Sequence, residues 1–317
     1  MTETRPIRCV FLGTPAFAVP TLRALAGRGI SPVAVYTQPD QPAGRGRRPR
    51  GSSVKDAAEE LGLAVVQPIS LRAPEETERL RSFEPTVLVL AAFGQILPAR
   101  FLDVPPRGGL NVHPSLLPAY RGPSPVATAI LDGVESTGVS IFAMDAGMDS
   151  GPVITRRRIP IEVGETTTML TERLAEHGAA LLMETLEPWV DGLIKAGIQD
   201  PSSATKTQLL SRTDGTLDFS EPAEILARKV RAFDPWPGTA TTLGGQKFNI
   251  RSAHPADSRD QAGTPGEVVF ESGSIGVVSG NGTVLGLDQV QLAGKRPVSA
   301  AAFARGRRDF VGTQLPS

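Results

Sequence analysis

One uninterrupted apolar run constrains the fold more than any other segment of the sequence. Residues 86–92 read Thr-Val-Leu-Val-Leu-Ala-Ala, and after Thr86 no polar side chain interrupts the run. A strand that is apolar on both faces is typical of a parallel sheet that helices cover on each side. The run therefore indicates a mostly parallel α/β domain.

Other strands and helices alternate around this run. The sequence predicts strands at residues 7–13, 32–37, 65–66, 110–113 and 139–144, and helices at residues 17–25, 54–61, 126–131 and 166–190. Ser53 is the expected N-cap of the second helix. Strands that alternate with helices predict a Rossmann-like, mostly parallel sheet with helices on both faces.

The pattern changes near residue 200. Residues 200–204 read Asp-Pro-Ser-Ser-Ala, which is typical of a linker. After a short helix predicted at residues 223–232, brief strands separated by Gly are expected at residues 247–250, 266–270, 275–278 and 284–287, and their spacing predicts a small β-barrel or sandwich. We expect a first domain at residues 1–200, a linker at 201–210 and a second domain at 211–317.

Composition limits the classes of function. Lys and Arg balance Asp and Glu at 33 each, so any nucleic-acid contact must come from local basic patches. The single cysteine, Cys9, excludes an internal disulfide, and no zinc-ligand spacing is present. We find no signal peptide and no apolar segment near the ~20 residues that span a bilayer. We therefore expect a cytoplasmic protein that uses no metal and no membrane.

Two polar side chains occur together at the end of the strand predicted at residues 110–113. Asn111 and His113 project from the same face of that strand, and Pro114 ends it because Pro lacks an N–H. A lone His is more often structural, but only His113 among three histidines ends a predicted strand with a polar partner two residues earlier. Open α/β sheets bind ligands at such strand ends. Acyl transfer to an amine needs a donor for the developing oxyanion and an acceptor for the proton of the amine, and the Asn111 amide and the His113 imidazole fit these two roles.

A carboxylate would complete this group, and a later turn offers two. Residues 144–151 read Met-Asp-Ala-Gly-Met-Asp-Ser-Gly, a polar turn after a predicted strand. An acid beside His113 would fix its tautomer and stabilise its charged form. Asp145 and Asp149 both suit this role, and both are also ordinary turn-forming residues. The residues alone leave the choice between them open.

Several segments resemble the methionyl-tRNA formyltransferase family, in the family's order. They are residues 11–15, 37–46, 111–118, 120–122, 144–151 and 231–238. Asn-x-His followed by Ser-Leu-Leu-Pro is similar to the broad superfamily of folate-dependent formyltransferases, whereas the Pro-Ala-Gly-Arg-Gly loop is more particular to the tRNA enzymes. The resemblance implies a C-terminal OB-like β-barrel domain. It also implies transfer of the formyl group of 10-formyltetrahydrofolate to the α-amine of methionyl initiator tRNA.

The resemblance also implies roles for individual residues. Asn111, His113 and Asp149 would be catalytic, with Asp149 rather than Asp145 paired to His113. The folate would lie against two segments, namely Phe93, Gly94, Gln95, Ile96 and Leu97, and Ser115, Leu116, Leu117 and Pro118. Two departures concern the acceptor: Pro114 stands where the tRNA enzymes commonly have Gly, and Pro123-Ser124 replaces a pair of alanines.

A basic loop is the expected contact with tRNA. Residues 38–50 carry Arg45, Arg47, Arg48 and Arg50 against one acid, Asp40. Such a loop is often simply solvated, but Arg45 matches the Arg of the family's loop, which would order on the acceptor end of tRNA. From residue 206 onward, 13 Lys and Arg face 11 Asp and Glu, so the second domain is mildly basic. We expect a monomer with a moderate, salt-sensitive affinity for initiator methionyl-tRNA.

Three other functions agree with parts of the sequence. A formyltransferase for a small amine, such as an amino-sugar nucleotide, would share the folate site, but a small substrate does not need four arginines. A catalytically silent RNA-binding protein would keep the basic loop, although the intact Asn111, His113 and Asp149 argue against it. A dinucleotide-binding oxidoreductase would need a Gly where Pro15 follows Gly13-Thr14.

Overall fold

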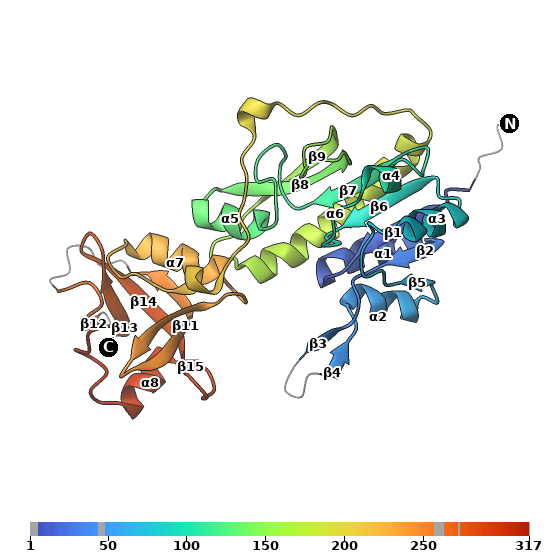
Figure 1. The fold of residues 1–317 in the computed structure, drawn as a ribbon. Helices are drawn as coiled ribbons and strands as arrows, with labels where there is room; N and C mark the ends of the chain where they lie inside the picture. The colour runs from blue at the N-terminus through green and yellow to red at the C-terminus, as the bar shows by residue number, and fades with distance from the viewer. Residues whose placement is uncertain (1–5, 44–47, 257–262, 272, 317) are drawn as a thin grey trace. The chain divides into compact units, whose positions relative to one another are not determined.

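The computed structural model describes residues 6–43, 48–256, 263–271 and 273–316. The chain forms two compact units, one of residues 1–125, 136–160 and 171–207 and one of residues 126–135, 161–170 and 208–317 (Figure 1). Two short early segments therefore group with the C-terminal region. The domain boundaries expected from the sequence, at residues 200 and 211, stay a prediction.

The first unit is built on a seven-stranded sheet in the order β5-β2-β1-β6-β7-β8-β9. The strands are β1 (Cys9–Gly13), β2 (Ala34–Tyr36), β5 (Val65–Val66), β6 (Val87–Ala91), β7 (Gly109–His113), β8 (Ser136–Ala143) and β9 (Val153–Pro160). The strands from β5 to β7 run parallel, whereas β8 and β9 are antiparallel at one edge. The predicted mostly parallel α/β sheet is confirmed, and the apolar run forms its central strand β6.

Helices cover both faces of this sheet. They include α1 (Val19–Gly27), α2 (Ser53–Glu60), α3 (Pro74–Ser82), α4 (Ala99–Leu102) and α6 (Thr167–Val190). On one face, Leu80 of α3 and Phe101 of α4 belong to the same apolar cluster as Leu88 of β6. On the other, α6 approaches so closely that a Cβ on Gly178 would lie 2.6 Å from Cγ1 of Val112. Val112 thus faces α6, and its strand neighbours on either side face away from it.

Some local predictions are wrong in detail. Ser52 rather than Ser53 caps α2, because its Oγ accepts a hydrogen bond of 3.0 Å from the backbone N of Lys55. The segment at residues 38–51, expected as a loop, contains an antiparallel hairpin of β3 (Gln41–Ala43) and β4 (Arg48–Arg50). Periodicity does not predict the edge strand β9, because residues 156–158 are three consecutive arginines that break any apolar alternation.

The second unit contains a six-stranded antiparallel sheet, which confirms the separate β-domain. Its order is β10-β11-β14-β13-β12, with β15 paired to β14. The elements are α5 (Pro125–Asp132), η3 (Arg212–Gly215), α7 (Ala223–Ala232), β10 (Thr239–Leu243), β11 (Gln246–Pro255), β12 (Val268–Glu271), β13 (Ser274–Ser279), β14 (Thr283–Leu292), β15 (Val298–Ser299) and α8 (Ala300–Gly306). Phe248 of β11 packs against the rings of Phe303 and Phe310, which closes the core of the sheet. Within the described ranges, no helix is long and apolar enough to cross a membrane.

Candidate active site

A pocket of about 350 Å³ opens where β6 and β7 end. It is lined by Leu90, Ala92, Phe93, Gly94, Asn111, Val112, His113, Pro114, Gly122, Pro123, Pro125 and Asp149. Directly after β6, Ala92 and Gly94 adopt left-handed backbone conformations, with φ of 47° and 88°. The hydroxyl of Thr14 donates to the Phe93 carbonyl at 2.8 Å and holds this turn. Backbone groups at the end of β6 therefore border the pocket in a fixed arrangement.

Asn111 has hydrogen-bonding capacity that its described neighbours leave unused. Its side chain is 7% exposed and lines the pocket, and its Oδ1 is buried without a hydrogen-bond partner among the described residues. A buried amide oxygen without a partner carries a free-energy cost, which a ligand that donates to it would remove. The amide of Asn111 is thus available to a molecule in the pocket.

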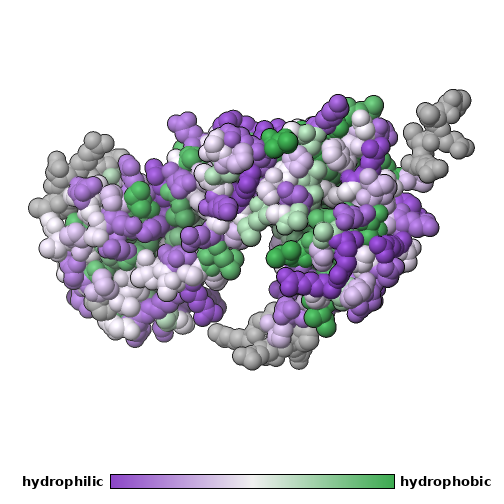
Figure 2. Space-filling view, turned by 45° about the horizontal axis from the view of Figure 1, so that its top comes forward, coloured by the Kyte–Doolittle hydropathy of each residue, from purple (hydrophilic) through white to green (hydrophobic). Residues whose placement is uncertain are grey.

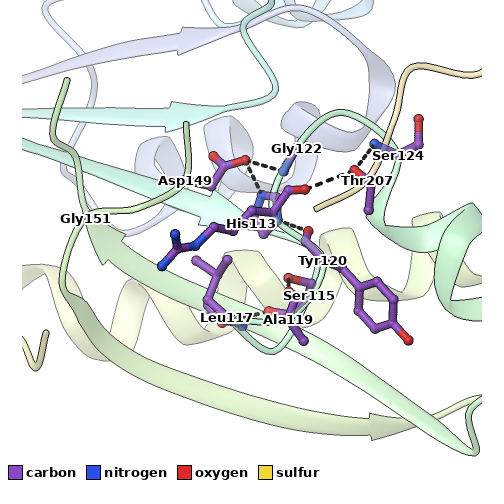
Figure 3. A network of polar contacts seen from close by, with 12 residues as sticks. His113, Ser115, Leu117, Ala119, Tyr120, Gly122, Ser124, Asp149, Gly151 and Thr207 are labelled. Atoms are coloured by element: carbon purple, nitrogen blue, oxygen red, sulfur yellow. Dashed lines mark hydrogen bonds and ion pairs between the residues drawn. The ribbon is translucent and has the colours of Figure 1, made fainter. Parts of the chain in front are cut away.

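His113 lies at the end of β7 between two oxygen atoms. Its Nε2 is 3.0 Å from the carbonyl oxygen of Tyr120, and because a carbonyl can only accept, Nε2 carries the proton and donates. Nδ1 of the neutral ring is then unprotonated, and it lies 3.8 Å from Oδ2 of Asp149 (Figure 3). This separation is too long for a hydrogen bond, but a proton gained at Nδ1 would face a carboxylate that stabilises it. The geometry makes Nδ1 the basic atom of the site.

The structure also separates the two candidate aspartates. Asp149 has a left-handed backbone, with φ of 50°, and its Oδ2 accepts a 2.8 Å hydrogen bond from the backbone N of Gly122. Asp145 is exposed, and its Oδ1 accepts hydrogen bonds of 3.0 Å from Gly147 N and from Ser150 Oγ. Asp145 therefore stabilises its own turn, whereas Asp149 lies beside His113.

Sequence reasoning missed Gln199, whose buried side chain joins the two loops of the site. Its Nε2 donates to the carbonyls of Asp149 at 2.9 Å and Gly151 at 2.7 Å. Its Oε1 accepts from Nε of Arg121 at 3.1 Å and from Nη2 at 2.8 Å. All four hydrogen-bonding positions of the amide are thus used, and the side chain is 3% exposed. A single Gln near a predicted linker carries no motif, so no sequence signal identifies it.

The chain that follows Gln199 fixes the same loop a second time. Thr205 Oγ1 accepts from Tyr120 N at 2.7 Å, and Thr207 N donates to Arg121 O at 2.7 Å. Gly122 packs so closely that an added Cβ would lie 2.9 Å from the carbonyl oxygen of Thr207. Tyr120 and Gly122, whose backbones contact His113 and Asp149, are therefore held from outside the pocket.

The first predicted folate segment borders the pocket only in part. Phe93 and Gly94 line it, whereas Ile96 is 73% exposed and Leu97 belongs to the apolar cluster under α4. Oε1 of Gln95 accepts from Leu71 N at 3.1 Å, so this side chain braces a neighbouring loop. The contribution of the segment to the pocket comes mainly from the turn after β6.

The second predicted folate segment turns two of its side chains inward. Ser115 is fully buried and donates to Ala119 O at 2.7 Å, and Leu117 is in an apolar cluster with Phe142. Leu116 and Pro118 are half-buried. Ser115 and Leu117 can therefore offer a ligand only their backbone, and the folate contacts of both segments stay a prediction.

The arginines predicted to contact tRNA are described only in part. Arg45 and Arg47 lie outside the described residues, as does the side chain of Arg48, and Arg50 is exposed at the end of β4. Asp40 stands before the hairpin, where it accepts from Gln67 at 2.7 Å and pairs with Lys55 at 2.7 Å. The hydrogen bonds from Gln67 and then Lys55 hold the pKa of the Asp40 carboxyl below its ordinary value. This acid therefore anchors the hairpin to α2 and to the segment that follows β5.

Neither a metal nor a reactive thiol is indicated. Within the part of the chain that the structure describes, no group of three or more His, Cys, Asp or Glu side chains is placed to hold a metal ion. Cys9 is fully buried in β1, and burial raises the pKa of its thiol to about 12. The polar side chains that line the pocket are those of Asn111, His113 and Asp149.

Comparison with known proteins identifies the family. Residues 7–186 match the family model described as formyl transferase, and residues 209–308 match the one described as formyl transferase, C-terminal domain. A methionyl-tRNA formyltransferase of Roseiflexus castenholzii is 46% identical over 310 residues, which cover 98% of this chain and 99% of the relative. The chain belongs to the methionyl-tRNA formyltransferase family. The predicted family, enzyme class and co-substrate are thereby confirmed: formyltransferases of this family take the formyl group from 10-formyltetrahydrofolate.

Solved structures share the fold of this formyltransferase at lower identity. An N-formyltransferase from Helicobacter canadensis, in complex with folinic acid and dTDP-3-aminofucose, has a TM-score of 0.65 at 18% identity and covers 89% of this chain and 98% of its own. HypX from Aquifex aeolicus, in complex with tetrahydrofolic acid, has a TM-score of 0.64 at 17% identity, over 97% of this chain and 48% of HypX. At these identities the likeness shows the fold alone.

Proposed function

We propose that this formyltransferase transfers the formyl group to the α-amine of methionyl initiator tRNA. The single observation that carries the chemistry is the placement of His113, whose Nε2 lies against the Tyr120 carbonyl and whose Nδ1 faces Asp149 in a pocket that also contains the Asn111 amide. The acceptor is proposed from relatives of 43–46% identity, which bear the name methionyl-tRNA formyltransferase over nearly their whole length. The reaction would take place in the cytoplasm, with the enzyme acting as a monomer.

The pocket suits the reactive end of a formylated folate. Its volume is in the range of small-molecule sites, its lining mixes apolar side chains with backbone groups after β6, and the Asn111 amide lacks a partner among the described residues. When bound, 10-formyltetrahydrofolate supplies a formyl carbon on N10 that an amine can attack. We propose that the contacts come from Phe93, Gly94, Gln95, Ile96 and Leu97, and from Ser115, Leu116, Leu117 and Pro118.

The proposed role of Asn111 is to stabilise negative charge. As the amine adds to the formyl carbon, charge develops on the formyl oxygen, and the Asn111 Nδ2–H can donate to it. A preorganised donor in a partly water-excluded pocket stabilises such charge more than water does. The amide does this without exchanging a proton.

The proposed role of His113 is to move one proton. The attacking nitrogen must lose a proton as its new bond to the formyl carbon forms, and Nδ1 of His113 is placed to accept it. The proton then faces Asp149, whose carboxylate stabilises the imidazolium and whose own position Gly122 fixes. The departing folate nitrogen takes up a proton as its bond to the formyl carbon breaks, so the proton count balances.

The proposed tRNA contacts lie outside the pocket. The hairpin that carries Arg45, Arg47, Arg48 and Arg50 offers cations to the phosphates of the acceptor end, because guanidinium groups bind phosphate with two donors. We assign the catalytic domain to residues 1–200 and the tRNA-binding OB-like domain to residues 211–317, with a linker at 201–210.

The competing proposal is formylation of an amino-sugar nucleotide, which the fold of the Helicobacter canadensis enzyme allows. The deciding experiment compares initial rates with 10-formyltetrahydrofolate and either methionyl initiator tRNA or dTDP-3-aminofucose. We expect turnover with the charged tRNA alone. Turnover with only the sugar nucleotide would overturn the proposed acceptor and leave the proposed chemistry intact.

A further inference from the structure

A second pocket, of about 330 Å³, surrounds the exposed side chain of Trp236 in the C-terminal unit. Its walls come from η3, from the segment between α7 and β10, and from β11. The charged residues that line it are Arg212 and Lys247, and no described acidic residue is part of the lining. An aromatic ring and two cations therefore converge from three elements of the fold.

Backbone contacts shape the floor of this pocket. Leu217 N donates to Ala240 O at 3.1 Å, which joins the chain after η3 to β10. Gly215 packs against the turn that carries Trp236 so tightly that a Cβ would lie 2.0 Å from the Gly238 carbonyl oxygen. The turn is thus supported from below while the Trp236 ring stays 48% exposed.

The two cationic side chains of the pocket have no polar partner among the described residues. The side chains of Arg212 and Lys247 are exposed, and neither forms an ion pair or a hydrogen bond with another described residue. Over the C-terminal unit, the face shown in Figure 2 mixes apolar and hydrophilic residues. An exposed Trp that shares a pocket with two cations lacking partners among the described residues suits a flat, anionic ligand.

We propose that this pocket binds RNA, with one unpaired nucleobase stacked on Trp236 and the neighbouring phosphates on Arg212 and Lys247. Every base offers a π face, so stacking of this kind tolerates sequence, and cations beside the ring track the backbone. The proposal rests on the proposed function, because the RNA acceptor there is initiator tRNA. It adds a specific contact for that RNA in the C-terminal unit.

Fluorescence tests the site without any catalysis. The chain has two tryptophans, so Trp189→Phe leaves Trp236 as the sole indole, and Trp236→Phe leaves Trp189, which is half-buried and donates to Arg107 O. Titration with uncharged initiator tRNA should quench the first variant and leave the second unchanged. An unquenched Trp236 would overturn the proposal. Quenching by adenosine monophosphate at the same concentrations as tRNA would also overturn it, because the ligand would then be a free nucleotide.

Kinetics test the contribution of the site to tRNA use. Trp236→Ala should raise KM for methionyl-tRNA about tenfold with kcat within about twofold, and Trp236→Phe should recover most of the loss because it keeps a π face. The Arg212→Ala and Lys247→Ala double variant alters only exposed side chains. It should lower the slope of log KM against log salt concentration by about two. Unchanged KM and salt slope in these variants would contradict the proposal.

The two proposals can fail separately. If the wild-type enzyme does not formylate methionyl-tRNA, the proposed acceptor is wrong, while quenching of Trp236 by tRNA still supports an RNA site. If the wild-type enzyme does formylate methionyl-tRNA and the Trp236→Ala variant has the same KM for methionyl-tRNA, only the Trp236 site is overturned.

Discussion

The pocket beside His113 and the pocket beside Trp236 hold their polar groups in opposite ways. In the first, His113 and Asn111 are 5% and 7% exposed, and hydrogen bonds from Gly122 and Gln199 fix the loop of Asp149. In the second, the side chains of Arg212 and Lys247 are exposed and form no hydrogen bond or ion pair with another described residue, and Trp236 is about half exposed.

This difference teaches what each pocket can do. Proton transfer needs atoms within a few tenths of an ångström of one geometry, which buried and multiply bonded groups provide. A polyanion with many phosphates needs only nearby cations, and exposed cations act through a field that salt screens. We therefore expect substitutions in the first pocket to lower kcat, and substitutions in the second to raise KM and change its salt dependence.

The largest effect is expected from His113→Ala. Loss of the proton acceptor should lower kcat by about a hundredfold to ten-thousandfold, the usual contribution of a positioned general base, while the Kd for the folate changes little. Single-turnover formylation and folate binding by calorimetry measure the two quantities. A His113→Ala enzyme with wild-type kcat would remove His113 from the mechanism.

Asn111→Ala should follow, with a loss of kcat of about a hundredfold or more, as for one oxyanion donor. Because Oδ1 has no described partner, the substitution removes no hydrogen bond among the described residues, and the thermal midpoint should stay close to that of the wild type. Turnover measurements check kcat, and differential scanning calorimetry of the same preparation checks the thermal midpoint. A large fall in stability with little change in turnover would indicate a structural role instead.

Gln199→Glu should have a smaller but diagnostic effect. The carboxylate keeps its pairing with Arg121 but cannot donate to the carbonyls of Asp149 and Gly151, so the loop that positions Asp149 loosens. We expect kcat to fall about tenfold, with little change in KM for the folate or for methionyl-tRNA. Gln199→Ala should lower kcat further. Asp200→Asn is the matched control, because the neighbouring Asp200 carboxylate accepts hydrogen bonds only within its own turn. Equal rates for Gln199→Glu and the control would contradict a positioning role.

The smallest effect is expected from Asp40→Asn at the base of the Arg-rich hairpin. It weakens the link to Lys55, so KM for tRNA should rise by no more than about threefold with kcat unchanged, because ion pairs near the surface contribute little. The depressed pKa of Asp40 means that its charge is present throughout the neutral range and is lost only as pH falls through that depressed value. The ratio of variant to wild-type KM should therefore be constant from pH 6 to 9. A ratio that varied in this range would contradict an Asp40 that stays charged there.

Local patterns predicted much of the fold. The helix at residues 223–232 agrees with α7 in both bounds, and the apolar run at residues 86–92 forms β6 to within one residue at each end. They did not predict α3, because its Pro-Glu-Glu start and charged surface leave few apolar positions to set a helical period. They also did not predict β9, an edge strand rich in arginine.

The sequence by itself determined the layered α/β fold and the shared face of Asn111 and His113, because apolar periodicity and strand alternation are properties of neighbouring residues. Only the tertiary structure decided that Asp149 rather than Asp145 lies beside His113, and that Gln199 holds both loops. Gln199 and Arg121 are 78 residues apart in the chain, and Trp236 shares a pocket with Arg212 and Lys247 only because η3 and β11 flank its turn. Contacts of this kind depend on how elements pack, which no local pattern records.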